Sequence, residues 1–272
     1  GNVDVYRLDP IKVNIKGMDI EGSTAFGLIQ LSRCRDSHII DYKGKHTSNN
    51  LISIDRCYNT SITNPSGTNK GDGGDDYGIV ITNSQTVKVV GGRLYARRHP
   101  ITTGGTNEVC SVPCRDIQII GSTLTNDFAA NVHAADFHGN TEDSRYLDCT
   151  IYGGGTWQGK NNGYIDCIIY NAGNGVCVFA AEILGGEHYA RSCQMISYVN
   201  PQPTGRGLIN IGGQGVDGQV VSQFTEEDVT FEISNGSITS QALSNVTSVV
   251  LFRNLGATVN VNFVLIIFIQ MF

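Results

Sequence analysis

One pattern of side chains recurs in LIQLSRCRDSHIID (28–41), LISIDRCYNTSITN (51–64) and GIVITNSQTVKVVG (78–91). Each copy has an alternating apolar strand, a polar corner at Cys34, Cys57 or Ser84, and a second alternating strand. The segment CRDIQIIGSTL (114–124) repeats the second half, with Cys114 at the corner. Apolar residues at every second position predict strands with one buried face. Strands that recur along the chain in this way predict a solenoid of stacked rungs.

A second family of corners sets the register of the rungs. The equivalent positions are Tyr42, Pro65, Gly92, Ser122, Cys149, Cys167 and Cys193. They are separated by 23, 27, 30, 27, 18 and 26 residues, as expected for rungs that carry insertions on one face. Hairpin turns are scarce and no amphipathic helix links the strands, which argues against a sandwich and a Rossmann fold. The sequence therefore predicts an all-β fold, a right-handed parallel β-helix with rungs of about 25 residues.

Stacked rungs would bring equivalent residues about 4.8 Å apart. The last three positions of the register are all cysteine, so we expect them to form an internal ladder. Cysteine is a small apolar residue that buries well, and a reduced ladder explains the eight cysteines of the chain better than disulfides or zinc.

Composition narrows the class of protein. The 272 residues carry a net charge of −6, which argues against a nucleic-acid partner. The opening GNVDVYRLDP lacks the apolar segment of a signal peptide, and the closing NFVLIIFIQMF (262–272) is too short for a membrane helix of about 18 residues or more. We expect no membrane insertion and a single domain over 1–272. Residues 250–272 would then be a cap, an interface strand or a truncated segment.

Residues that carry chemistry gather in the loops of the longest rungs. These loops are KGDGGDDYG (70–78), ARRHPITTGGTNEVCSVP (96–113), NDFAANVHAADFHGNTED (126–143), GGGTWQGKNNGY (153–164) and VFAAEILGGEHYARS (178–192). The candidate substrate-binding residues in them are Arg97, Arg98, His99, His133, Trp157, Lys160, Glu187 and His188. A lone tryptophan in a polar loop favours stacking on a sugar ring, whereas the arginines are either anion contacts or ordinary solvated charges.

The register also predicts which of these residues share a face. Thr103, His133 and Lys160 each lie 11 residues past their anchors, which predicts one outward row. In AADFHG (134–139), Asp136 and His138 point one way and Phe137 the other, because strand side chains alternate. If Phe137 faces the core, Asp136 and His138 face solvent.

Residues 78–200 resemble the pectate-lyase-like β-helix of bacteriophage tailspike and appendage proteins, which depolymerise capsule, O-antigen or exopolysaccharide. The resemblance rests on YGIVITNSQTVKVVGG, RRHPITTGG, HAADFHGNTED and WQGKNNGY. It implies a bacterial surface polysaccharide as partner, a homotrimer, and a place in the virion tail after synthesis in the host cytoplasm. Head-binding and C-terminal trimerisation segments are not evident, which indicates a truncated chain or a short member of the family.

The resemblance further implies cleavage of a glycosidic bond. Hydrolysis uses two carboxylates, about 5–5.5 Å apart for retention and about 6.5–9.5 Å apart for inversion. Asp136 and Glu182 lie two rungs apart, with backbones about 9.6 Å from each other, and this favours an inverting pair tuned by His138 or His133. Glu142 is the alternative partner. In the alternative interpretation neither residue is catalytic. Asp136 would cap a turn, and Glu182 would simply point outward from its strand.

Two other functions compete with hydrolysis. A lyase would eliminate across a uronate, with Arg97, Arg98, His99 and Lys160 supplying the base and the positive charge. A non-catalytic spike would use the same groove only to bind glycan. No cofactor is required in any of these readings. Calcium near Asp72, Asp75 and Asp76 is a weaker alternative to a plain acidic loop.

Overall fold

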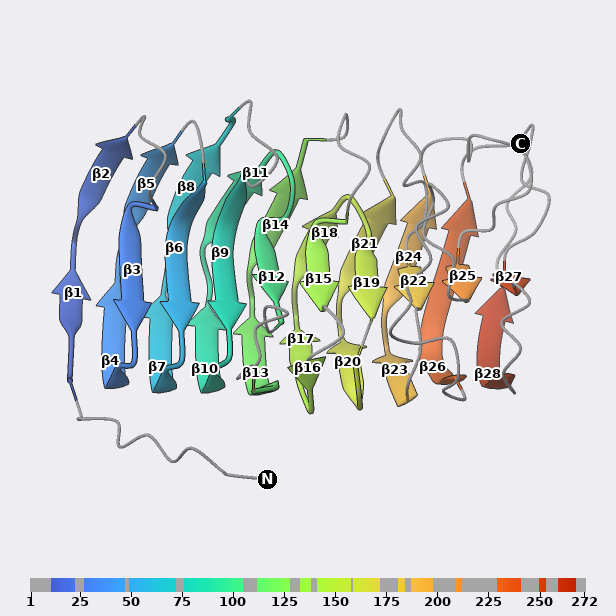
Figure 1. Cartoon of the computed structure of the whole chain (residues 1–272). Helices are drawn as coiled ribbons and strands as arrows, with labels where there is room; N and C mark the ends of the chain where they lie inside the picture. Colours follow the sequence, from blue (N-terminus) through green and yellow to red (C-terminus); the bar gives the residue numbers. More distant parts are fainter. Residues whose placement is uncertain are drawn as a thin grey trace, which may run out of the picture.

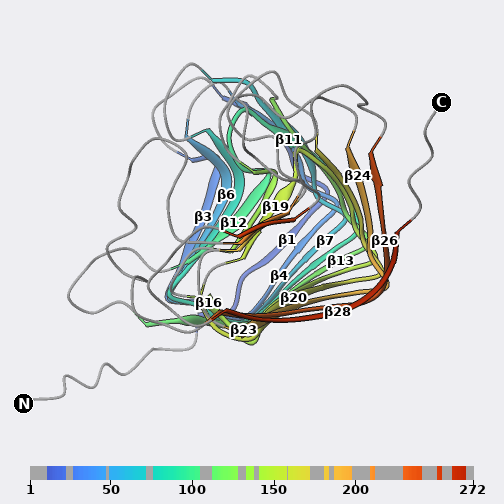
Figure 2. The same ribbon diagram turned by 90° about the vertical axis from the view of Figure 1, so that its right-hand side faces the viewer.

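The computed structural model describes residues 11–22, 27–46, 49–71, 76–104, 112–127, 133–137, 141–157, 159–171, 181–183, 187–197, 209–211, 229–240, 250–252 and 259–267. These residues form a right-handed parallel β-helix, and its rungs succeed one another from β1 to β28 (Figure 1). Viewed from the side that lies 90° away, the strands of successive rungs stack behind one another (Figure 2). In the described ranges no helix is long and apolar enough to cross a membrane.

Each rung contributes one strand to each of three walls. A nine-stranded parallel sheet forms the first, which we call wall A. Its strands are β3 (Ile29–Ser32), β6 (Asn50–Asp55), β9 (Tyr77–Thr82), β12 (Ile101–Thr103), β15 (Ala135–Phe137), β19 (Gly155–Trp157), β22 (Ala181–Ile183), β25 (Ile209–Ile211) and β27 (Val250–Phe252).

A 19-stranded sheet bends to form the other two walls. Wall B contains β1 (Asn14–Lys16), β4 (Arg35–Ile40), β7 (Tyr58–Thr63), β10 (Gln85–Val90), β13 (Cys114–Ile120), β16 (Thr141–Glu142), β17 (Arg145–Leu147), β20 (Asn162–Ile165) and β23 (Glu187–Arg191). Wall C contains β2 (Asp19–Gly22), β5 (Lys43–His46), β8 (Ser66–Asn69), β11 (Arg93–Ala96), β14 (Thr123–Asn126), β18 (Thr150–Tyr152), β21 (Ile168–Asn171) and β24 (Gln194–Ser197). The long strands β26 (Val229–Ser240) and β28 (Val259–Ile267) continue this sheet beyond β23 and β24.

Strand pairing confirms the predicted register. The residues just after the seven anchors pair in one unbroken row, from Lys43 with Ser66 to Ile168 with Gln194. The anchors themselves therefore follow one another from rung to rung. The apolar run near the C-terminus forms β28, which pairs in parallel with β26.

The cysteines lie in two ladders inside the coil. Six of the eight fall in the described residues, and all six are buried and free of disulfides: Cys34, Cys57, Cys114, Cys149, Cys167 and Cys193. The predicted ladder is thus confirmed for Cys149, Cys167 and Cys193. Cys110 and Cys177 lie outside the described residues.

A left-handed residue interrupts wall B at the same place in six successive rungs. The residues are Asp36, Asn59, Thr86, Asp116, Asp143 and Asn161, with φ between 49° and 54°. Most are Asp or Asn, which tolerate this conformation better than other residues with a side chain. The row therefore explains why short polar residues recur at one corner of the repeat.

Buried polar side chains bond the backbone amides beside this row. The Ser144 hydroxyl accepts a hydrogen bond from the Ile117 N–H at 3.0 Å, and the Asn162 side-chain oxygen accepts one from the Ser144 N–H at 2.9 Å. His188 Nδ1 accepts a hydrogen bond from the Asn162 N–H at 3.3 Å. His188 is buried and holds the backbone of the preceding rung, so its predicted role in binding substrate is wrong.

The core changes from aliphatic to aromatic along the coil. Wall B presents Ile39, Ile62, Val89, Ile119, Tyr146 and Tyr164 inward in one row. In the rungs of the two tyrosines the inward side chains of wall A are small, namely Ala135 and Gly155. A Cβ on Gly155 would lie 2.9 Å from the Tyr164 hydroxyl oxygen. The tyrosines therefore fill space that the opposite wall leaves.

We predict that Ser144→Ala lowers the free energy of unfolding by about 1–3 kcal/mol, because the buried Ile117 N–H loses its acceptor. Urea denaturation of the two proteins measures the difference. The control is Ser53→Ala on the outer face of β6, for which we expect a change within about 0.5 kcal/mol. Equal destabilisation by both substitutions would contradict the role given to the Ser144 hydroxyl.

Candidate functional site

A row of outward-facing positions crosses wall A. Pairing of β9, β12, β15, β19 and β22 aligns Val80, Thr102, Asp136, Thr156 and Glu182. Asp136 and Glu182 are thus two rungs apart in one row, as the repeat predicts, with backbones about 9.6 Å from each other. The structure describes Glu182 as part of its strand, without its side chain.

Asp136 is buried although it belongs to the outward row. Phe137 faces the core as predicted, but only 2 % of Asp136 is exposed, and its neighbours Thr102 and Thr156 are 4 % and 3 % exposed. The expectation that Asp136 faces solvent is therefore wrong. Strand alternation predicts which way a side chain points, and it does not predict what packs over that face.

Asp136 is held by hydrogen bonds to its side chain and to its backbone. The Thr102 hydroxyl, on the preceding rung, donates to Asp136 Oδ2 at 2.8 Å. Inside the coil, the Asp136 N–H donates to the Tyr146 hydroxyl at 3.2 Å, and that hydroxyl donates to the Ile101 carbonyl at 3.4 Å. The aromatic core of wall B therefore supports the backbone on which the carboxylate stands.

The imidazole of His99 lies beside the Asp136 carboxyl group. His99 Nδ1 lies 2.6 Å from the His133 carbonyl oxygen, which can only accept, so Nδ1 carries a hydrogen. His99 Nε2 lies 3.6 Å from Asp136 Oδ2. A buried carboxyl group that accepts a hydroxyl donor and lies beside an imidazole is the kind of group that can serve as a general acid.

His133 is the neutral member of the cluster. Burial lowers its pKa from 6.5 to about 4, against the opposing effect of the Asp136 charge, and His99 lowers it further. His133 therefore carries no charge near neutral pH. Tyr77 stacks on the His99 ring with centroids 5.5 Å apart and planes 6° apart.

The predicted arginines lie beside this cluster. Arg98 places its guanidinium 5.3 Å from the centroid of the Tyr77 ring, on the ring that His99 also stacks against. Arg97 is exposed and donates a hydrogen bond to the Gly71 carbonyl at 3.0 Å. The run of residues 97–99 is thus fastened to the neighbouring rung by ring contacts and backbone bonds.

The alternative carboxylate, Glu142, lies on a different wall. It begins wall B on β16, where its Oε2 accepts a hydrogen bond from Arg115 Nε at 3.2 Å. Lys160 is exposed and forms a parallel bridge with Glu142. The proposed row of Thr103, His133 and Lys160 is wrong, because Thr103 pairs with Phe137 and faces inward. Turns of unequal length make equal offsets from the anchor unreliable.

Trp157 belongs to the core. It is fully buried, and its ring centroid lies 4.1 Å from that of Tyr164. The prediction that it stacks on a sugar ring is therefore wrong. Gly155 faces inward two residues earlier, so the two-residue period also turns Trp157 inward, into space that a small neighbour leaves.

Some predicted residues are outside what the structure describes. His138, Asp72 and Asp75 lie in undescribed segments, and Glu187 is described only as part of β23. Asp76 is buried. Within the described ranges no three potential metal ligands cluster, so calcium near this loop stays a prediction.

Sequence reasoning missed three residues that shape the site. Thr102 bonds the Asp136 carboxylate, Tyr146 supports its backbone, and Tyr77 stacks on His99. The signal for Thr102 was present in the alternation of ITT (101–103), which places it one rung before Asp136. No local pattern could indicate the two tyrosines, because their contacts cross the interior or join different rungs.

Three solved structures share this fold. The tailspike protein gp49 of Pseudomonas phage LKA1 is 33% identical, with a TM-score of 0.76 over 96% of this chain and 46% of that one. The tailspike gp61 of Pseudomonas phage phi297 is 22% identical, with a TM-score of 0.71 over 96% and 42%. The Gp54 tailspike of Acinetobacter baumannii bacteriophage AP22, in complex with A. baumannii capsular saccharide, is 23% identical, with a TM-score of 0.67 over 85% and 38%. The chain spans less than half the length of these proteins.

The rungs, their register and these likenesses define a β-helix of the phage tailspike type. The chain belongs to the family described as Gp49, pectin lyase-like, which matches residues 42–269. A search of curated proteins found no match.

We predict that His133 makes the protein less stable in acid. The unfolded chain takes up a proton on this histidine below pH 6.5, whereas the folded protein does so only near pH 4. The contribution of neutral His133 to the free energy of unfolding is therefore intact above pH 6.5. It is lost as the pH falls toward 4, which lowers the free energy of unfolding by about 2–3 kcal/mol. In His133→Gln the loss of stability between about pH 7.5 and pH 4.5 should be smaller by about 2 kcal/mol, measured by denaturation at both pH values. Identical losses in the two proteins would show that His133 titrates normally.

Proposed function

We propose that this chain is the β-helix with which a phage tailspike binds and hydrolyses bacterial surface polysaccharide, either capsule, O-antigen or exopolysaccharide. On this proposal the protein acts in the virion tail as a homotrimer, after synthesis in the host cytoplasm. The support is the 33% identity to a phage tailspike over 96% of the chain, together with membership of the family.

The observation that carries hydrolysis is the buried Asp136 carboxyl group, which accepts the Thr102 hydroxyl and lies 3.6 Å from His99 Nε2. In the proposed reaction, Asp136 in its protonated form donates its proton to the glycosidic oxygen as the bond to the anomeric carbon breaks. Glu182 takes a proton from the water that bonds to that carbon. A carboxylate pair two rungs apart suits an inverting reaction, for which separations of about 6.5–9.5 Å leave room for the water. Thr102 and Tyr146 hold the acid in position.

A glycan-binding spike without catalysis is the second candidate. The observation that favours it is burial, since 2 % of Asp136 and 4 % of His99 are exposed. A polymer does not reach this carboxyl group in the structure as it stands. Under this reading, Asp136 and His99 form a structural pair that stabilises wall A.

We predict that Asp136→Asn and Glu182→Gln each lower the rate of oligosaccharide release by about 10²–10⁴-fold, since each removes an acid or base. The assay incubates the protein with capsular polysaccharides, O-antigens and exopolysaccharides and measures new reducing ends. Products that absorb in the ultraviolet as unsaturated uronates would indicate a lyase.

The matched control is Asp166→Asn, an exposed residue in a left-handed corner that asparagine also tolerates. The Asp166→Asn protein should cleave polysaccharide at the wild-type rate. Glycan binding without release by the wild-type protein across the whole panel would refute hydrolysis and leave the binding spike.

A further inference from the structure

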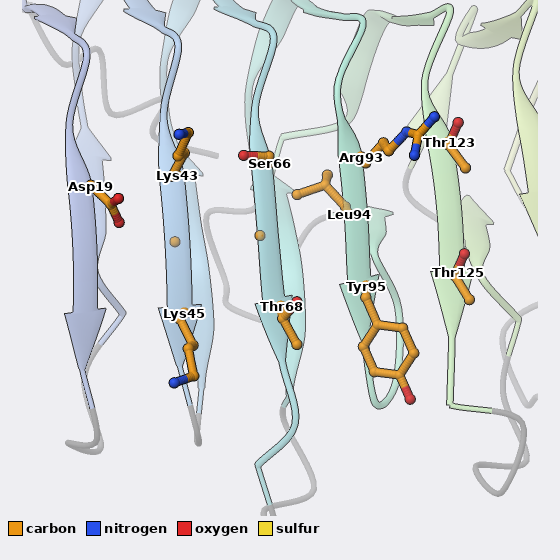
Figure 3. Close-up of a pocket in the computed structure, with 12 residues that line it drawn as sticks. Asp19, Lys43, Lys45, Ser66, Thr68, Arg93, Leu94, Tyr95, Thr123 and Thr125 are labelled. Carbon is orange, nitrogen blue, oxygen red and sulfur yellow. The ribbon is translucent and has the colours of Figure 1, made fainter.

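A groove of about 520 Å³ crosses the outer face of wall C (Figure 3). It spans strands β2, β5, β8, β11 and β14, and it lies on a different wall from Asp136. Two outward rows line it. One contains Asp19, Lys43, Ser66, Arg93 and Thr123, and the other contains Lys45, Thr68, Tyr95 and Thr125.

Two cations of this groove form no ion pair within the described part of the chain. Lys43 and Arg93 are exposed, and within the described part of the chain neither has an ion-pair partner. Lys45, by contrast, binds Glu21 at 2.7 Å. Asp19 ends the row one rung before Lys43, so the groove is not uniformly positive. The positive charge without an ion-pair partner is therefore that of Lys43 and Arg93.

The spacing of these two points is set by the coil. Lys43 pairs with Ser66 and Ser66 with Arg93, so the cations stand two rungs apart, about 9.6 Å between backbones, with a hydroxyl between them. One rung is close to the length of a sugar residue in an extended glycan. The row therefore matches a chain that carries an anionic group on alternate sugars.

Hydroxyl groups and aromatic rings complete the lining. Ser66, Thr68, Thr123 and Thr125 present hydroxyl groups to the groove. Tyr95 is half-buried, with the Lys70 ammonium 5.2 Å from its ring centroid. Its row continues beyond Thr125 to Tyr152 and Tyr170, whose rings stack 4.8 Å apart with planes 5° apart. An aromatic face with a polar tip suits the mixed surface of a sugar ring.

We propose that this groove binds an anionic polysaccharide lying along the coil axis, with carboxylates on Lys43 and Arg93 and the intervening sugar over Ser66 and Thr68. The proposal rests on the proposed function in taking the ligand to be a glycan. It adds the substrate class, a polymer of acidic sugars, and a binding wall separate from the wall that carries Asp136. Bound there, the polymer would be retained at the surface of the protein between cleavage events.

The experiment measures binding of the full chain to alginate, polygalacturonate and hyaluronan by calorimetry, with carboxyl-reduced alginate as the uncharged control. At least one of these three acidic polysaccharides should bind, more weakly as salt is raised. Lys43→Ala/Arg93→Ala should weaken that binding at least about tenfold, since it removes two charge-assisted contacts. Lys16→Ala/Lys88→Ala removes the same charge from exposed positions on wall B and should bind like the wild-type protein.

Several results would overturn the proposal. They are no binding of any of the three acidic polysaccharides, binding of carboxyl-reduced alginate as tight as that of alginate, and equal effects of the two double substitutions. A change of oligomeric state in Lys43→Ala/Arg93→Ala by sedimentation velocity would also overturn it, because the groove would then be a contact between copies of the chain. If the proposed function is wrong but the groove binds glycan, no glycan is cleaved and the groove substitutions still weaken binding. If the protein cleaves glycan and the groove substitutions leave binding unchanged, only the groove proposal is rejected.

Discussion

Parallel pairing between successive rungs is the interaction on which the structure depends. Each strand bonds to the equivalent strand of the next rung, so a residue on one rung determines which residue lies about 4.8 Å away on the next. This produces the cysteine ladders, the left-handed corner row and the row that joins Asp136 to Glu182. It also produces the spacing of Lys43 and Arg93. A shift of one residue in any strand would turn its inward side chains outward, and for this reason the register is strongly constrained.

The interior links the three walls. Where wall A presents Ala135 and Gly155, wall B presents Tyr146 and Tyr164, and the volume of one side compensates for the other. The same tyrosines extend their hydroxyls to the backbone of wall A, one at Asp136 and one at the Ala135 carbonyl, 3.2 Å away. Packing and the candidate site are therefore coupled, because the residue that fills the core also positions the carboxylate.

Much of the fold was predictable because its determinants are local and periodic. Alternating apolar residues and recurring corners predict the strands, the anchors and the row that contains Asp136 and Glu182. Equal offsets failed for Thr103 and Lys160 because the turns between walls differ in length. Trp157 was misassigned because its loop is polar, whereas its environment is set by Gly155 and Tyr164 across the interior. The groove of wall C is not indicated by the sequence, because Lys43 and Arg93 lie on regular strands and not in the inserted loops that concentrate the other chemical side chains.

The cysteine ladders determine how readily the protein is oxidised in air. Neighbouring cysteines on a parallel ladder have backbones close enough for a disulfide, which usually spans about 4.4–6.8 Å between Cα atoms. Burial raises the pKa of the Cys57 thiol to about 11 and also raises the pKa of Cys114. The thiolate is the form that oxidises, so these side chains react slowly with oxidants. Cys57 and Cys114 should therefore stay unmodified in aerated solution for as long as the coil is folded, and the onset of their labelling by a thiol reagent would report local opening of the rungs.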